Sequence, residues 1–281
     1  MRIKKTPLEV LREVWGYSDF RGIQAEIIHS ILQNRDPLGL MPTGGGKSIA
    51  FQVPALVLEG VCIVVTPLIA LMKDQVDNLR KRNIRAAAIY SGQSHEEVIR
   101  HLDNAVLGAY DLLYLSPERL ETDLFQTKLR RMKVSFITID EAHCISQWGH
   151  DFRPEYTQLK AIREQFPQIP IVALTATADK ITREDIVRQL DMKNPKTFIS
   201  SFDRPNLSLD VRRGYQQKEK TRTILEFIFK RPNECGIIYC MSRDNTEKVC
   251  DMLIRHGVKA TVYHAGLTPT ARDKAQEDFI N

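Results

Sequence analysis

The sequence is poor in cysteine and tryptophan and has no long apolar run. Its 281 residues include two tryptophans and five cysteines, an odd number with no Cys-x-x-Cys pair, at Cys62, Cys144, Cys235, Cys240 and Cys250. A disulfide framework is therefore not expected. No stretch approaches the ~20 apolar residues of a membrane-spanning helix, and the basic N-terminus is not followed by a secretory apolar core. We expect a cytoplasmic protein, associated with the nucleoid if it is bacterial, with no membrane partner.

The overall composition is that of a soluble globular protein. Hydrophobic residues make up 43% of the chain and charged residues 27%. Forty Lys and Arg against 35 Asp and Glu leave a formal charge of +5, which suits a polyanionic partner but also suits an ordinary solvated surface. No internal repeat or low-complexity tract occurs. The length allows roughly two domains, each with its own core.

Six apolar, β-rich segments alternate with polar stretches of helical spacing. The expected strands cover residues 38–41, 61–66, 86–90, 111–115, 134–139 and 171–174, and helices are expected over 69–82 and 156–165. This alternation predicts an α/β fold with a doubly wound parallel sheet covered on both faces. Active residues of such sheets gather at the carboxyl ends of the strands. Five polar or turn-rich clusters fall at such ends, namely 44–47, 66–67, 116–117, 140–141 and 175–177.

The pattern changes near residue 205. A new cycle follows, with helices expected over 221–230, 246–256 and 270–280 and strands over 236–240 and 260–264. Two strands are few for an α/β sheet, which typically has 5 or 6. The sequence therefore predicts a first domain over 1–204 and part of a second α/β domain over 205–281.

A glycine-rich turn, Met41–Ser48, follows the first expected strand. Gly44, Gly45 and Gly46 let backbone N–H groups surround phosphate oxygens without Cβ clashes. Lys47 suits the β- and γ-phosphates, and the Ser48 hydroxyl suits Mg²⁺. Met41 stands where the general phosphate-binding pattern has its first glycine, so the prediction depends on the second half of the pattern and its strand–turn–helix context. The alternative is a flexible turn beside a surface lysine.

An acidic pair, Asp140-Glu141, follows the expected strand over 134–139. Phosphoryl transfer needs one group to hold the metal and another to orient or deprotonate water. Adjacent residues at a strand end point in different directions, so one carboxylate can serve each role. Alone, such a pair is commonplace in a solvated loop; together with Lys47 it predicts a nucleoside triphosphate site.

A loop rich in aromatic, basic and amide side chains follows the acidic pair. Its residues of interest are Gln147, Trp148, His150, Phe152 and Arg153. Base stacking on aromatic rings contributes about 1–3 kcal/mol per base, which suggests coupling to unpaired bases; packing of each ring on its own domain is an equal alternative.

A zinc site at the same place is not expected. The residues that invite it are His143, Cys144 and His150, but their spacing fits no usual ligand pattern and a fourth ligand is missing. We expect no metal other than magnesium there.

Together these segments resemble the RecQ family of DNA helicases, within helicase superfamily two, over nearly the whole chain. Residues 15–24 resemble its adenine-recognition motif, and Pro42–Ser48 resemble motif I, which does not require the early glycine. Asp140–His143 resemble the DEAH form of motif II, and Cys144–Tyr156 resemble its aromatic-rich loop. The stretches 175–177 and 237–243 resemble motifs III and IV.

The resemblance implies two RecA-like domains and an ATP-dependent helicase that moves 3′ to 5′ on single-stranded and forked DNA in repair and recombination. It implies that Arg21 and Gln24 read the adenine, and that Asp140 binds Mg²⁺ while Glu141 activates water. The residues implied to hold the nucleotide are Met41, Pro42, Thr43, Gly44, Gly45, Gly46, Lys47 and Ser48; His143 completes motif II; and those implied to sense DNA are Gln147, Trp148, His150, Phe152, Arg153, Thr175 and Thr177.

One motif of the family does not occur in the sequence. The Q-x-x-G-R-x-G-R stretch that supplies an arginine finger is absent from the 281 residues. We therefore expect an N-terminal fragment that binds ATP and Mg²⁺ but turns over slowly and does not separate strands. Two alternatives remain: an RNA-remodelling relative with the same ATP machinery, and a non-catalytic ATP-dependent nucleic-acid-binding module.

Overall fold

The structure, a computed structural model, describes residues 5–148, 151–203 and 206–280. The chain divides into two compact units, residues 1–204 and 205–281. Each unit is described by itself below. Among the described residues, no helix combines the length and apolar character required to cross a bilayer.

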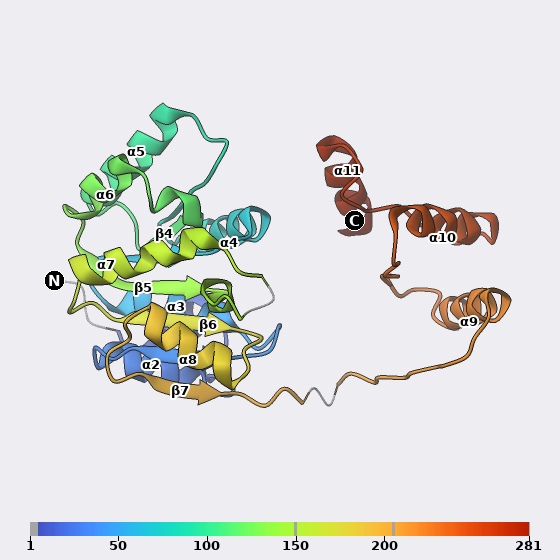
Figure 1. The fold of residues 1–281 in the computed structure, drawn as a ribbon, viewed down its shortest axis with the longest axis horizontal. Helices are drawn as coiled ribbons and strands as arrows, with labels where there is room; N and C mark the ends of the chain where they lie inside the picture. The colour runs from blue at the N-terminus through green and yellow to red at the C-terminus, as the bar shows by residue number, and fades with distance from the viewer. Residues whose placement is uncertain (1–4, 149–150, 204–205, 281) are drawn as a thin grey trace. The chain divides into compact units, whose positions relative to one another are not determined.

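The first unit is built on a seven-stranded sheet in which every pairing is parallel (Figure 1). The strand order is β3-β4-β2-β5-β6-β1-β7. The strands are β1 (Pro37–Leu40), β2 (Val61–Val65), β3 (Ala86–Ile89), β4 (Leu112–Leu115), β5 (Val134–Asp140), β6 (Ile171–Thr175) and β7 (Lys196–Ile199). The predicted doubly wound parallel sheet is confirmed, and six of its strands are those expected from the sequence.

The sequence analysis missed β7 because only one of its four residues, Phe198, is buried. An edge strand with a single core contact lacks the apolar run that marks the central strands. It pairs only with β1, through the register Leu38↔Thr197 and Leu40↔Ile199.

The described residues of this unit form eight α-helices. They are α1 (Pro7–Trp15), α2 (Gln24–Leu32), α3 (Lys47–Val57), α4 (Ile69–Lys81), α5 (His95–Val106), α6 (Asp123–Leu129), α7 (Leu159–Gln165) and α8 (Lys180–Gln189). Most of them cover the two faces of the sheet, while α1 packs on α3. In Figure 1, α7 and α8 lie in front of the sheet and α2 and α3 lie behind it. The helix expected over 156–165 begins at 159, because residues 154–158 form a 3₁₀ turn instead.

The core follows the two-residue period of the strands. Ile63 of β2 belongs to the core cluster that includes residues of α5, α6, α7 and α8, whereas its neighbour Val64 belongs to the cluster that includes residues of α2, α3 and α4. Both side chains are 0–1% exposed. Successive side chains of a strand point to opposite faces, so a sheet covered on both sides needs apolar residues at every position. This explains the continuous Val-Cys-Ile-Val-Val run of β2.

The second unit contains α9 (Gln217–Phe229), α10 (Arg243–Arg255) and α11 (Pro269–Ile280). The helix predictions for this unit hold, apart from shifts of one to four residues at their ends. The strands predicted over 236–240 and 260–264 are wrong: neither segment pairs with a strand in the described part of the unit. A strand needs a ladder partner, and without one Ile237 and Tyr239 stay 66% and 92% exposed.

Candidate nucleotide and nucleic-acid site

The glycine turn joins the end of β1 to the start of α3. Gly44 and Gly46 have φ of 79° and 75°, in the left-handed region that glycine tolerates best. The Gly45 N–H donates to Pro42 O at 2.9 Å, which closes the turn. Because α3 begins at Lys47, the turn lies at the positive end of a helix. This geometry is that of an anion cradle.

Lys47 meets the acidic pair across the sheet. Its Nζ donates to Glu141 Oε1 at 2.6 Å and lies 3.9 Å from Asp140 Oδ1. Asp140 ends β5, and its side chain is only 6% exposed. Glu141 follows with φ of 51°, in the left-handed region, and both carboxylates approach the same ammonium. The turn and the acids thus form one cluster, although Lys47 and Glu141 are 94 residues apart.

Burial raises the pKa of Asp140 to about 6, against the opposing pull of the Lys47 charge, and the Glu141 charge raises it further. Two carboxylates share one ammonium here, so the cluster carries excess negative charge in a dehydrated place. A divalent cation with oxygen ligands relieves such a charge. The residues therefore fit Mg²⁺: Asp140 and the Ser48 hydroxyl, in the first turn of α3, would hold it, and the backbone from Gly44 to Lys47 would hold phosphates.

Gln24 is joined to the glycine turn. Its Nε2 donates to Gly46 O at 3.0 Å, and its Oε1 accepts from the Arg21 N–H at 2.8 Å. Gln24 is 4% exposed. The Arg21 guanidinium lies 5.4 Å from the centre of the Tyr17 ring, which adds a cation–π contact. Of the two predicted adenine-reading residues, Gln24 therefore contacts the phosphate turn, and Arg21 contacts Gln24.

The other residues of the turn differ in exposure. Met41 is buried and its N–H donates to Thr175 O at 3.0 Å, whereas Thr43 is exposed and Pro42 is half-buried. Met41 therefore belongs to the sheet rather than to the cradle, because its backbone extends the β1–β6 ladder.

His143 connects motif II to the end of β6. Its Nδ1 lies 2.9 Å from Thr175 Oγ1 and 3.4 Å from Glu141 Oε2. The Thr175 hydroxyl donates to Thr177 O at 3.2 Å and accepts from the Thr177 N–H at 3.2 Å. Because that hydroxyl has already used its proton, His143 Nδ1 must carry the hydrogen of their contact. Three predicted residues thus form one chain of contacts that starts at Glu141.

The aromatic loop presents Trp148 to solvent. Its side chain is 71% exposed, which excludes the packing alternative for this ring, while Phe152 and Arg153 are half-buried. Gln147 is exposed, and His150 lies outside the described residues. A cavity of about 280 Å³ separates the loop from the 3₁₀ turn after β4; its lining is Pro117, Glu118, Phe152, Arg153, Pro154 and Glu155.

Two anchoring residues escaped the sequence analysis. The Ser146 hydroxyl donates to Asp185 Oδ2 of α8 at 2.7 Å and accepts from the Trp148 N–H at 3.2 Å. Asp185 is 4% exposed, although α8 is largely polar. Asp185 shares the core side of α8 with the buried Thr182, three residues earlier, and an acid on the core side of a helix needs a partner.

The fold and this site are those of the P-loop nucleoside triphosphatases with RecA-like domains. The chain belongs to the DEAD/DEAH box helicase family, whose model matches residues 21–186.

Several curated relatives, among them proteins from Haemophilus influenzae and Bacillus subtilis, carry the name ATP-dependent DNA helicase RecQ. The protein from Haemophilus influenzae is 46% identical over 276 residues, which cover 98% of this chain and 44% of the relative. The one from Bacillus subtilis is 42% identical over 274 residues, covering 97% of this chain and 46% of the relative. The chain thus spans about half the length of the curated relatives it matches.

Among solved structures, the Mycobacterium smegmatis helicase Lhr bound to single-stranded DNA and AMP-PNP superposes with a TM-score of 0.66. The match covers 98% of this chain and 40% of that one, at 18% identity. At this identity the likeness concerns the fold alone, and it agrees with the RecA-like assignment.

Proposed function

We propose that this chain is the ATP-binding part of a RecQ-type helicase that moves 3′ to 5′ on single-stranded and forked DNA. The observation that carries the proposal is the continuous set of contacts Lys47–Glu141–His143–Thr175, which joins the phosphate turn to the ends of β5 and β6. The aromatic loop begins at Cys144, the residue after His143. The relatives named ATP-dependent DNA helicase RecQ support both DNA as the polymer and ATP as the nucleotide.

In this proposal Lys47 exchanges partners during turnover. Its ammonium binds Glu141 Oε1 at 2.6 Å, and the β- and γ-phosphates would compete for it when ATP binds. Glu141 Oε1 then accepts a proton from the attacking water, while His143 Nδ1 keeps its hydrogen bond to Thr175. Bound Mg²⁺, held by Asp140 and Ser48, would supply charge neutralisation at the phosphates.

DNA would act through the same set. Trp148 offers an exposed ring for stacking, and Arg153 offers a guanidinium for phosphate. The loop that carries both residues starts at Cys144, directly beside His143. In this proposal, binding of single-stranded DNA to the loop shifts His143, and through it Glu141. The DNA repair role typical of RecQ enzymes follows from the same proposal. We also propose a cytoplasmic location.

We further propose that residues 1–281 alone bind ATP–Mg²⁺ but hydrolyse it slowly. The support is the absence of a Q-x-x-G-R-x-G-R stretch from the printed sequence. An arginine finger contributes about 10³–10⁵ in rate. We therefore expect this chain to bind ATP–Mg²⁺ but to hydrolyse ATP slowly.

The test measures both quantities on the same protein. A fluorescent ATP analogue should bind with Mg²⁺, and phosphate release should stay slow with or without single-stranded DNA. Lys47→Ala should abolish binding, whereas the exposed Lys133→Ala should leave it unchanged. Rapid DNA-stimulated hydrolysis would contradict the slow-turnover proposal. Binding that survives Lys47→Ala would contradict the site, and preferential response to RNA would favour an RNA-remodelling relative.

A further inference from the structure

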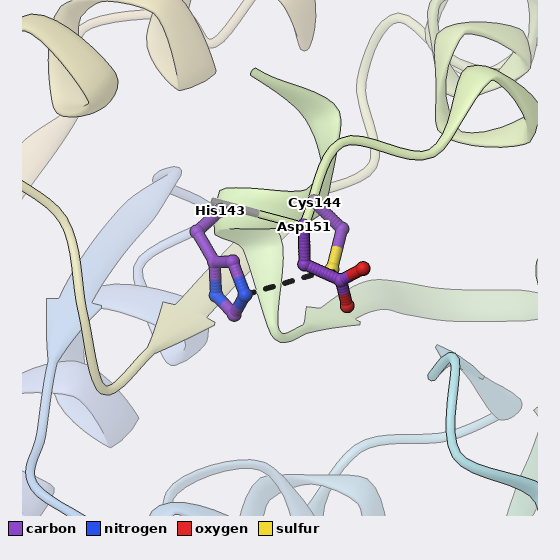
Figure 2. A group of neighbouring side chains, drawn as sticks. All are labelled: His143, Cys144 and Asp151. Atoms are coloured by element: carbon purple, nitrogen blue, oxygen red, sulfur yellow. Dashed lines mark hydrogen bonds between the residues drawn. The ribbon is translucent and has the colours of Figure 1, made fainter. Parts of the chain in front are cut away.

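Beside the nucleotide site, His143, Cys144 and Asp151 bring three metal-ligand side chains together (Figure 2). Cys144 Sγ lies 3.7 Å from His143 Nε2 and 3.7 Å from Asp151 Oδ2. The three donor atoms all lie within 4.8 Å of one another. The sequence analysis weighed His150 as the third ligand here; in the structure Asp151 takes that place beside the other two.

These separations match those of a tetrahedral zinc centre. With Zn–S of about 2.3 Å and Zn–N or Zn–O of about 2.0–2.2 Å, tetrahedral geometry puts sulfur about 3.6 Å from either other donor. The two 3.7 Å separations from sulfur are close to this value, and the His143 and Asp151 donor atoms lie within 4.8 Å of each other. His143 and Cys144 are buried, whereas the Asp151 side chain is 50% exposed, so an ion has access from the loop side.

The hydrogen bonds around His143 already select the ligating tautomer. Nδ1 carries the hydrogen, because the Thr175 hydroxyl uses its own proton on Thr177 O. Nε2 therefore carries the lone pair, and it faces Cys144 Sγ. A metal-bound histidine commonly donates its other ring N–H to an oxygen, which fixes the ring. His143 meets that condition through Thr175 and Glu141.

We propose that His143, Cys144 and Asp151 form a site for a thiophilic divalent cation, Zn²⁺, with water as the fourth ligand. Thiolate and imidazole favour Zn²⁺ over Mg²⁺, so this site differs in chemistry from the Asp140 site. Binding converts the Cys144 thiol to a thiolate and releases its proton to solvent.

The bound ion would fix the start of the aromatic loop to motif II. Asp151 also pairs with Arg153, whose Nη2 lies 3.2 Å from Asp151 Oδ2. Coordination would compete with this pair and tie Asp151 to Cys144, on either side of Trp148. Zinc bound at this site could therefore reversibly inhibit DNA binding by the loop.

The test uses Cd²⁺ as a spectroscopic probe on the full chain, in excess Mg²⁺ to occupy the oxygen-ligand site. The background variant carries Cys235→Ser and Cys240→Ser, because these cysteines are the more exposed ones and would bind Cd²⁺ themselves. One equivalent of Cd²⁺ should produce the ultraviolet absorption of a Cd²⁺–thiolate bond, and Zn²⁺ should displace it.

Three further substitutions decide the outcome. Cys144→Ser should remove the absorption. Asp151→Asn should weaken Cd²⁺ binding roughly 10-fold or more, and because the Asp151 side chain is half-exposed, this variant should still fold. The buried Cys250→Ser, in the second unit, should change nothing. Absorption that survives Cys144→Ser, or an affinity unchanged by Asp151→Asn, would overturn the proposal.

Discussion

Lys47 Nζ lies 2.6 Å from Glu141 Oε1, so the residue proposed to bind phosphate and the residue proposed to activate water are paired with each other. Their side chains are 15% and 21% exposed, so the pair is only weakly screened by water. A ligand that carries negative charge into the turn must compete with Glu141 for this ammonium. The arrangement couples phosphate binding to the freedom of the carboxylate that would orient water.

Removing the charge of Asp140 should stabilise the fold while destroying nucleotide turnover. The folded carboxyl, with its pKa raised from 3.8 to about 6, holds its proton more tightly than the unfolded one. Its ionisation therefore costs the folded state stability as the pH rises from about 4 to about 6. At 1.36 kcal/mol per pKa unit, Asp140→Asn should add up to about 3 kcal/mol at pH 7.5 and roughly half of that at pH 5.

Urea unfolding at the two pH values measures this difference. Asp74→Asn, an exposed position on α4, serves as the control and should change stability little at either pH. If Asp140→Asn is less stable than the parent at pH 7.5, the charge of Asp140 does not destabilise the folded state.

Gly46→Ala should weaken nucleotide binding in addition to straining the backbone. A Cβ at Gly46 would lie 2.3 Å from Gln24 Nε2, so the amide would be displaced from the turn. Gly108 has a matching φ of 74°, and no atom lies within 4 Å of its would-be Cβ. Both alanine variants should lose about 1–2 kcal/mol of stability, but only Gly46→Ala should weaken ATP binding, by roughly 10-fold or more.

Thermal melting and titration with a fluorescent nucleotide separate the two effects. The preference for ATP over GTP should fall in Gly46→Ala as well, because Gln24 is the predicted reader of adenine. Equal nucleotide affinities in the two glycine variants would remove Gln24 from that role.

Trp148→Ala should weaken binding of single-stranded DNA without weakening the fold. The ring is 71% exposed, so its loss should change stability by less than about 0.5 kcal/mol. Base stacking contributes about 1–3 kcal/mol, which corresponds to a loss of roughly 5–150-fold in affinity. Fluorescence anisotropy with a labelled oligonucleotide measures it. Leu107→Ala, at an 82% exposed position after α5, is the control and should bind as the parent does.

Asp36→Asn should destabilise the first unit strongly. Asp36 and Arg163 form an ion pair and are 3–4% exposed. The carboxylate also accepts from the Ile171 N–H at 2.9 Å and from the Lys193 N–H at 2.7 Å, so it joins the starts of β1 and β6 to the approach to β7. Breaking a buried pair leaves an uncompensated charge and costs about 3–5 kcal/mol.

The matched control for that change is Glu184→Gln. Glu184 pairs with Lys180 on the surface of α8, at 69% and 81% exposure, and such pairs contribute about 0–1 kcal/mol. Urea unfolding of both variants should therefore differ by at least about 2 kcal/mol. A cost near that of the control would mean that water reaches Arg163 when its partner is lost.

Much of the fold and of the site was predictable because its signals are local. The continuous apolar runs of β2 and β5 require a sheet covered on both faces, and the three glycines before Lys47 permit left-handed backbone that other residues resist. The acidic pair at the end of β5 then follows from the geometry of parallel sheets. These features depend on neighbours in the sequence, so the sequence carries them in full.

The strands expected in the second unit failed for the opposite reason. The residues 236–240 have the composition of a strand, but composition cannot supply the adjacent strand whose N–H and C=O groups would complete the ladder. The edge strand β7 shows the same limit, since it exists through its pairing with β1 rather than through an apolar pattern of its own.

The sequence by itself determined the sheet, the phosphate turn and the acidic pair. Only the tertiary structure decided that Gln24 holds Gly46, that His143 donates to Thr175, and that Cys144 lies between His143 and Asp151. Hydrogen bonds and ligand clusters depend on distances of a few ångströms between side chains whose directions are set by packing. Those distances exist only once the chain has folded.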